Sequence, residues 1–134
     1  MTGAVLRRLV RARELLHAGV QRGPTLDELA VEAGLSRAHL ARQFAAAFGA
    51  PPHRYLTQLR IAKAKLSLAA GASVTEVCAE IGFESIGTFS TLFSRHTGYS
   101  PRAWQRETRT VVQSRGLPVM FIPPCFLKFY VEHV

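Results

Sequence analysis

Apolar residues recur at spacings of three and four through most of the chain, which is the pattern of amphipathic α-helices. Glycine, proline and small polar residues interrupt this pattern and divide it into segments of helical length. We expect helices over residues 4–17, 26–34, 37–48, 52–70, 74–81, 86–97 and from 101 onward. The sequence therefore predicts an all-α fold of about seven helices.

One pattern occurs twice after residue 25. Each copy predicts a helix that ends at a glycine, a tight turn and a second helix, which together form a helix-turn-helix. The matched positions are Leu26, Leu29, Ala30, Gly34, Leu35, Leu40, Phe44, Gly49, Pro52 and Tyr55 in one copy, and Val74, Val77, Cys78, Gly82, Phe83, Phe89, Phe93, Gly98, Pro101 and Trp104 in the other. Two such units would allow a monomer to contact two successive major grooves of DNA.

Local capping signals support these helix boundaries. Thr25 with Glu28, and Ser73 with Glu76, have the spacing of a capping box, in which a hydroxyl accepts from a backbone N–H three residues later. Gly34 stands where a helix can end in a left-handed residue. In the same way, Ser36 caps the third helix, and Ser100 precedes a proline at the first position of the last helix.

The predicted core lies on one stripe of each helix. On the first helix the stripe comprises Leu6, Leu9, Val10, Leu16 and the aliphatic stem of Arg13. On the connector helix it comprises Tyr55, Leu59, Ala62, Leu66 and Ala69. At 1.5 Å per residue this connector spans about 28 Å. That length is close to the roughly 34–36 Å between major-groove segments one turn apart.

We therefore expect a double helix-turn-helix domain over residues 1–109. Its first subdomain covers about 4–50, the connector about 52–70 and the second subdomain about 73–109. Residues 110–134 form an apolar C-terminal tail, which we expect to be extended or a short strand. So apolar a segment either packs on the helices or associates with another chain.

The chain is strongly basic, with a formal net charge of +8 and a pI near 10.5 over 134 residues. Such a surface attracts polyanions, and basic residues spread through helices favour DNA over a membrane. The two cysteines show no zinc-ligand spacing, and we expect neither metal nor cofactor. No export signal or membrane span is evident, so we expect a cytoplasmic protein.

These motifs resemble the DNA-binding domain of the AraC/XylS family of bacterial transcription regulators. The resemblance covers about residues 5–106. It is most specific in Ile81-Gly82-Phe83-Glu84-Ser85, Phe89-Ser90, Phe93, Gly98 and Ser100-Pro101, and weaker in Ser36, Leu40-Ala41-Arg42-Gln43-Phe44, Gly49, Tyr55 and Arg60-Ile61-Ala62-Lys63-Ala64. It implies a sequence-specific regulator that binds double-stranded DNA at the bacterial nucleoid. Because this chain leaves no room for a sensor domain, we expect a short, stand-alone member of the family.

The resemblance also implies which residues contact DNA. Arg42 is the leading base-reading candidate, because a guanidinium can donate two hydrogen bonds to guanine. The second copy has Gly87 and Thr91 where the family often has polar and arginine residues, which predicts weaker discrimination. The expected base-reading residues are Ala38, Ala41, Arg42, Ile86, Gly87, Thr88 and Thr91. The expected DNA-backbone residues are Ser36, Arg37, His39, His53, Arg54, Ser85, Ser90 and Arg95.

Two alternatives remain open. The chain could be an adaptor or architectural DNA-binding protein that acts mainly through RNA polymerase or a partner, with self-association through the tail. More remotely, AraC-like modules also occur in alkyl-transfer DNA repair proteins. Their Pro-Cys-His-Arg site is matched here only by Pro124-Cys125, and Phe126 follows, so no imidazole would activate the thiol.

Overall fold

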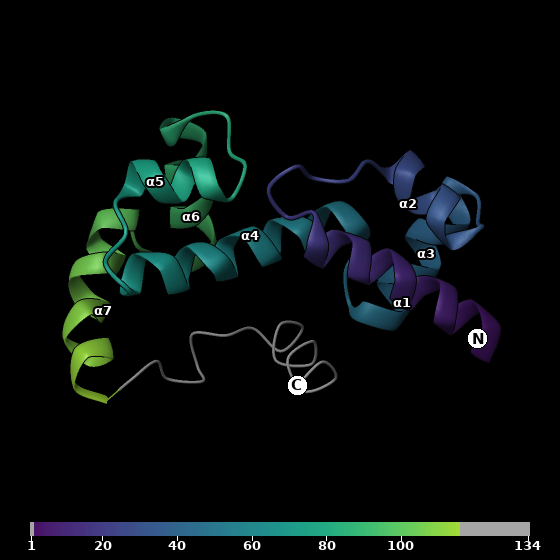
Figure 1. The fold of residues 1–134 in the computed structure, drawn as a ribbon, viewed down its shortest axis with the longest axis horizontal. Coiled ribbons are helices and arrows are strands. Elements are labelled where there is room, and N and C mark those ends of the chain that lie inside the picture. The colour runs from purple at the N-terminus through teal and green to yellow at the C-terminus, as the bar shows by residue number, and fades with distance from the viewer. Residues whose placement is uncertain (1, 116–134) are drawn as a thin grey trace. The chain divides into compact units, whose positions relative to one another are not determined.

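The computed structural model describes residues 2–115, and this part of the chain is all-α. It forms seven helices (Figure 1). They are α1 (Gly3–Ala18), α2 (Leu26–Ala33), α3 (Arg37–Phe48), α4 (Pro52–Ala69), α5 (Val74–Glu80), α6 (Ile86–Thr97) and α7 (Pro101–Arg115). The fold class predicted from the sequence is confirmed. The extended conformation expected from residue 110 was wrong for residues 110–115, which continue α7, and the rest of the predicted tail, including Cys125, lies outside the described residues. None of these helices is long and apolar enough to cross a membrane.

The chain divides into two compact units, Met1–Leu59 and Arg60–Val134. The boundary falls inside α4, whose 18 residues correspond to a length of about 27 Å. Each unit contains one helix-turn-helix, formed by α2 and α3 in the first unit and by α5 and α6 in the second. The duplication seen in the sequence is therefore also a duplication of structure.

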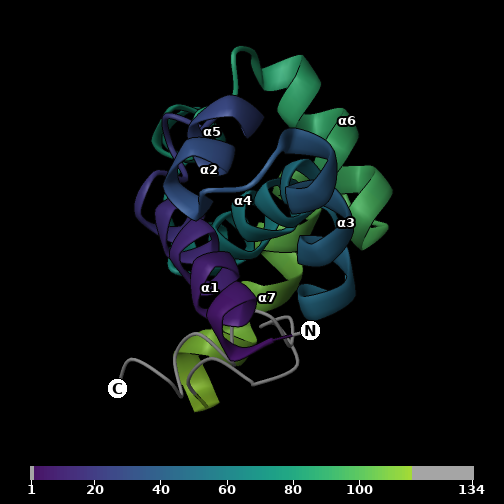
Figure 2. The ribbon, with the colours of Figure 1, turned by 90° about the vertical axis from the view of Figure 1, so that its right-hand side faces the viewer.

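In the first unit, α1 packs against both α2 and α3 (Figure 2). Leu9 and Leu16 of α1 are buried, and the Arg13 guanidinium lies 4.7 Å from the centre of the Phe48 ring. The sequence also placed Leu6 on this stripe, but its side chain is 44% exposed. That prediction was wrong, because the buried face of α1 begins one turn later, at Leu9.

The start of α4 completes this first core through Tyr55. Its ring lies 5.3 Å from the ring of Phe44, centre to centre, at nearly a right angle. Its hydroxyl is 2.8 Å from Nε2 of His17, so the polar end of a buried aromatic side chain has a partner. These contacts tie α1, α3 and α4 together.

The second unit has its own core of aliphatic and aromatic side chains. Its members are Ile61, Ala64, Leu68, Val77, Cys78, Ile81, Phe89, Phe93 and Trp104. The indole N–H of Trp104 donates to the Lys65 carbonyl at 3.1 Å. Nε2 of Gln105 donates to the carbonyls of Leu68 and Ala72, at 2.9 and 2.7 Å. Through these bonds α7 is fixed against the end of α4 and the turn that follows it.

The buried face of α4 differs from the single stripe predicted for the connector. Leu66 of that stripe is only half-buried. The other four members, Tyr55, Leu59, Ala62 and Ala69, are buried as expected. A second set, Ile61, Ala64 and Leu68, lies on a different side of the helix and is almost fully buried in the core of the second unit. The spacing of three and four from Tyr55 defines only one of these two sets, because the second begins at Ile61 on the other side of the helix.

Candidate nucleic-acid interface

The first helix-turn-helix consists of α2, a short turn and α3. Gly34 ends α2 with a φ of 67°, a left-handed conformation that favours glycine. Ser36 caps α3, because its Oγ accepts a hydrogen bond from the backbone N–H of His39 at 3.1 Å. Leu40 and Phe44 lie four residues apart and are fully buried. The other side of α3 is thereby left to solvent.

The solvent-facing side of α3 carries the predicted base-reading residues of the first unit. Ala38 and Arg42 are exposed one turn apart, and Ala41 is half-buried. The Arg42 side chain takes no part in the ion pairs found in the described part of the chain. Arg37, in contrast, forms an ion pair with Asp27, with its Nε 3.4 Å from Oδ1. Both partners are largely exposed, so this pair contributes little to stability and a phosphate could replace the carboxylate.

The second helix-turn-helix repeats this construction with α5 and α6. Gly82 has a φ of 85° in the turn. Oγ of Ser85 accepts from the backbone N–H of Thr88 at 3.1 Å and so caps α6. Phe89 and Phe93 are fully buried in the positions that Leu40 and Phe44 occupy in α3. Both recognition helices are thus held by the same pair of inward-facing positions.

The outward side of α6 is less polar than its hydroxyl groups imply. Over its first two turns the exposed residues are Ile86, Gly87, Thr88 and Thr91, and Ser90 is half-buried; Ser94, Arg95 and His96 are exposed further along. The Thr91 hydroxyl donates to the Gly87 carbonyl at 2.9 Å, and the hydroxyls of Ser85 and Thr88 lie 2.9 Å apart. While this internal bond is kept, the Thr91 hydroxyl offers an outside ligand its acceptor lone pairs, so the Gly87 carbonyl competes with a base for its proton.

A shallow groove borders each recognition helix, with a volume of about 200 Å³ in the first unit and about 250 Å³ in the second. The first groove is lined by Pro24, Leu26, Leu29, Ala41, Pro51, Pro52, His53 and Leu56. The second is lined by Val74, Thr75, Ile86, Ser90, Ser100, Pro101 and Arg102. Several of these positions correspond in the sequence repeat. In each unit the recognition helix therefore borders the start of the helix that follows it, α4 or α7.

Basic side chains stand at the start of both following helices. His53 and Arg54, expected to contact the DNA backbone, are exposed in the first turn of α4. Their counterpart in α7 is Arg102, which the sequence reasoning missed together with Arg106 and Arg109. The signal was present, because spacings of four and three place all three arginines on one face of a helix.

The structure thus gathers the predicted contact residues on two surfaces, one in each unit. The base-reading set lies on α3 (Ala38, Ala41, Arg42) and on α6 (Ile86, Gly87, Thr88, Thr91). The backbone set lies at the start of α3 (Ser36, Arg37, His39), at the start of α4 (His53, Arg54) and on or just before α6 (Ser85, Ser90, Arg95). Within the described residues, no three His, Cys, Asp or Glu side chains are grouped as metal ligands would be.

Comparison with known proteins agrees with this arrangement. Residues 29–107 match a protein family described as a helix-turn-helix domain. The chain is 42% identical over 77 residues to the HTH-type transcriptional activator RhaS of Escherichia coli, a match that covers 57% of this chain and 28% of RhaS. The chain spans less than half the length of the curated relatives that it matches.

Solved structures share the fold. One is a transcriptional regulator with an AraC-type DNA-binding domain from Chromobacterium violaceum, with 26% identity and a TM-score of 0.69, covering 85% of this chain and 98% of that one. Another is the DNA-binding domain of AdpA, a global transcriptional factor, in complex with a target DNA. It has 26% identity and a TM-score of 0.68 and covers 78% of this chain and 97% of that one.

Proposed function

The chain belongs to the AraC/XylS family of helix-turn-helix transcription regulators, and we propose that it reads specific DNA sites through both α3 and α6. Each recognition helix enters one of two successive major-groove segments. The observation that carries this proposal is the duplicated exposed face, held outward by Leu40 and Phe44 in one unit and by Phe89 and Phe93 in the other. The DNA-bound domain of AdpA, which has the same fold, supports it.

In this proposal α3 supplies most of the base discrimination. Arg42 donates two hydrogen bonds to O6 and N7 of a guanine, and Ala38 and Ala41 permit close approach or contact a thymine methyl group. Arg37 and His39 contact phosphates on either side of the groove. The Arg42 side chain is exposed and takes part in no ion pair among the described residues, which supports its role as the base-reading residue.

The second unit discriminates less. Ile86 and Thr88 offer methyl groups, and a base must compete with the Gly87 carbonyl for the hydroxyl proton of Thr91. Arg95 and the residues at the start of α6 contact the backbone. The proposed site is therefore asymmetric, with a well-defined half under α3 and a more degenerate half under α6.

We further propose that the protein acts on transcription in the bacterial cytoplasm, at the nucleoid, with RNA polymerase as a partner. The name of RhaS, a transcriptional activator, supports this role. Self-association through the C-terminal segment belongs to the same proposal. An adaptor that binds DNA without sequence preference is the competing function, and the experiment below separates the two.

The test is selection of binding sites from random DNA, followed by competition binding with an Arg42→Ala variant. We expect a selected site with a guanine that Arg42 reads. The variant should lose about 1–3 kcal/mol of preference at that base pair, or roughly 5- to 150-fold. Arg7→Ala, which removes an exposed arginine from α1, is the matched control and should keep the preference. Selection that yields no site, or full preference in the Arg42 variant, would refute the proposal.

A further inference from the structure

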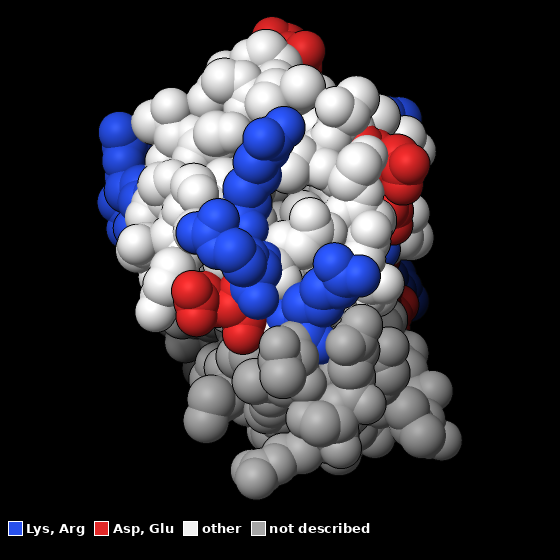
Figure 3. All heavy atoms as spheres, turned by 90° about the vertical axis from the view of Figure 1, so that its left-hand side faces the viewer, with Lys and Arg blue, Asp and Glu red and all other residues white. Residues whose placement is uncertain are grey.

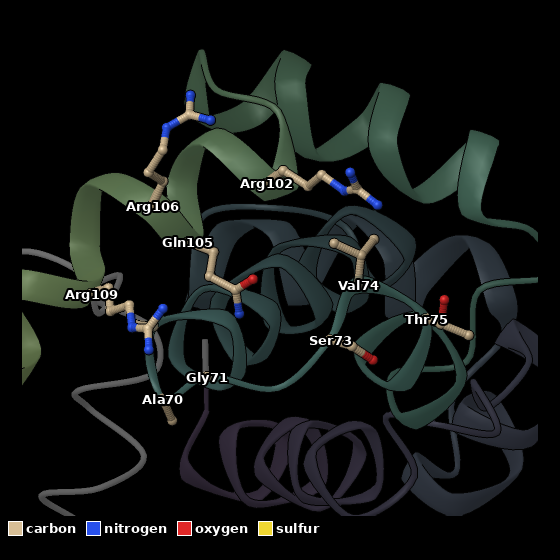
Figure 4. A pocket seen from close by; sticks show the side chains of 10 residues that line it. Ala70, Gly71, Ser73, Val74, Thr75, Arg102, Gln105, Arg106 and Arg109 are labelled. Carbon is tan, nitrogen blue, oxygen red and sulfur yellow. The ribbon is translucent and has the colours of Figure 1, made fainter.

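The second unit contains an open cleft of about 720 Å³ beside α7 (Figure 4). We call it the arginine cleft. It is lined by Ala69, Ala70, Gly71, Ser73, Val74, Thr75, Arg102, Gln105, Arg106 and Arg109. Three of these residues are positively charged and none is acidic. The charges are not neutralised by the lining, which favours an anionic occupant.

Hydrogen bonds hold α7, which carries the arginines of the cleft, against the turn between α4 and α5. Arg102, Arg106 and Arg109 share one face of α7, and all three are exposed. Gln105 lies among them and binds the carbonyls of Leu68 and Ala72, so α7 cannot slide along the α4–α5 turn without breaking two hydrogen bonds. Figure 3 looks onto the side of the second unit that carries α7, where Lys and Arg side chains gather with Asp or Glu side chains beside them.

The arginine cleft continues into the groove beside α6. Val74, Thr75 and Arg102 line both hollows, and the groove is closed on its other side by Ile86 and Ser90 of α6. A duplex that contacts the exposed side of α6 therefore has a direct path to the cleft. The basic surface is an extension of the recognition surface within one compact unit.

The recognition faces of the two units differ in charge, and the basic surface of α7 compensates for this difference. The recognition face of α3 carries Arg37 and Arg42, whereas that of α6 is uncharged from Ile86 to Thr91. Phosphate contacts supply most of the affinity of a DNA-binding protein. The α6 face has hydroxyl groups but no cationic side chain over its first two turns, and the arginines of α7 supply positive charge nearby.

We propose that the arginine cleft binds the sugar–phosphate backbone of the DNA flanking the segment under α6. Arg102 and Arg109 hold neighbouring phosphates, for which the fork of a guanidinium is suited. The arginines of α7 then contribute affinity for DNA of any sequence, whereas base preference comes mainly from α3 and to a smaller extent from α6. The inference rests on the proposed function, since it requires that a duplex lies on α6.

The test compares Arg102→Gln/Arg109→Gln with Arg7→Gln/Arg11→Gln, which removes the same charge from exposed positions of α1. Dissociation constants are measured between 50 and 200 mM salt, on the selected site and on a version scrambled under α3. The logarithm of the association constant falls as the logarithm of the salt concentration rises, and each lost phosphate contact makes the slope of this fall shallower by about 0.9. We expect the cleft variant to lose about 1.8 from the slope and about 60-fold in affinity near 0.1 M salt, equally on both DNAs. The control pair should keep the wild-type slope.

Two further arms complete the design. Arg102→Lys/Arg109→Lys keeps both charges and should retain most of the slope, and thermal unfolding should show that all variants are folded. An unchanged salt slope in the Gln variant would overturn the inference. Binding of inorganic pyrophosphate or an acidic peptide to the cleft would not rescue it, because the proposed ligand is the DNA backbone. A loss confined to one of the two DNAs would also overturn it. The proposed function fails separately, if the wild-type protein does not distinguish the selected site from the scrambled one.

Discussion

Replacement of Gln105 should lower the stability of the second unit by removing two hydrogen bonds that hold α7. The Gln105 amide group donates to the Leu68 carbonyl at 2.9 Å and to the Ala72 carbonyl at 2.7 Å. Gln105→Met keeps an unbranched side chain of similar length but removes both donors. The substitution therefore tests the two hydrogen bonds with little change in packing.

The expected loss follows from the environment of the two acceptors. The Leu68 carbonyl also accepts the backbone N–H of Gly71 at 3.1 Å, so it keeps one partner in the variant. A typical internal hydrogen bond contributes about 0.5–1.5 kcal/mol net. Ala72 is half-buried, so its carbonyl can bond to water in the variant. We expect Gln105→Met to lower the free energy of unfolding by about 1–2 kcal/mol, a fall in Tm of roughly 5–15 °C.

The fluorescence of Trp104 reports this change directly, because it is the only tryptophan and its indole lies in the core of the second unit. Urea unfolding followed by this signal should show a lower midpoint in the variant at unchanged slope. Gln58→Met, at another half-buried glutamine, is the control and should change the midpoint little. A loss below about 0.3 kcal/mol in the Gln105 variant would show that the bonds to Leu68 and Ala72 do not fasten α7.

Two other predictions concern titratable groups. Burial raises the pKa of the Cys78 thiol, so in a Cys125→Ser background the native protein should resist iodoacetamide near neutral pH and react once unfolded in urea; rapid labelling of the folded protein would contradict this. The hydrogen bond from Arg22 holds the pKa of Glu28 below its ordinary value, so this stabilisation is present above the carboxyl's unfolded pKa and is lost as the pH falls through its folded pKa. Arg22→Gln should therefore cost more stability at neutral than at acid pH in paired unfolding curves, and equal losses would argue against the pair.

Helix ends were predictable because their chemistry is local. Thr25, Ser36 and Ser73 each accept the backbone N–H three residues later, as the capping patterns indicated. Gly34 adopts the left-handed conformation expected at the end of α2. The inward positions of the recognition helices, such as Phe93, followed from helical periodicity and the repeat. A few neighbouring residues determine each of these features.

Features that depend on tertiary packing were not predictable in the same way. The burial of Leu68 in place of Leu66 depends on which face of α4 the second core uses. The ion pair of Arg37 with Asp27 joins two helices, so no spacing within one helix reveals it. The arginine cleft needs residues from α4, α5 and α7 together, and Arg102 joins it to the groove beside α6 only through the tertiary fold.

Methylation and ethylation interference on a selected binding site tests DNA contact by both α3 and α6 most directly. Two recognition helices in successive major grooves predict two clusters of interfering positions, about 10 base pairs apart on one face of the duplex. Guanine methylation should interfere strongly in the cluster read by Arg42, whereas phosphate ethylation should dominate in the other. A single cluster, or interference spread evenly over all phosphates, would contradict the reading of DNA by a duplicated helix-turn-helix.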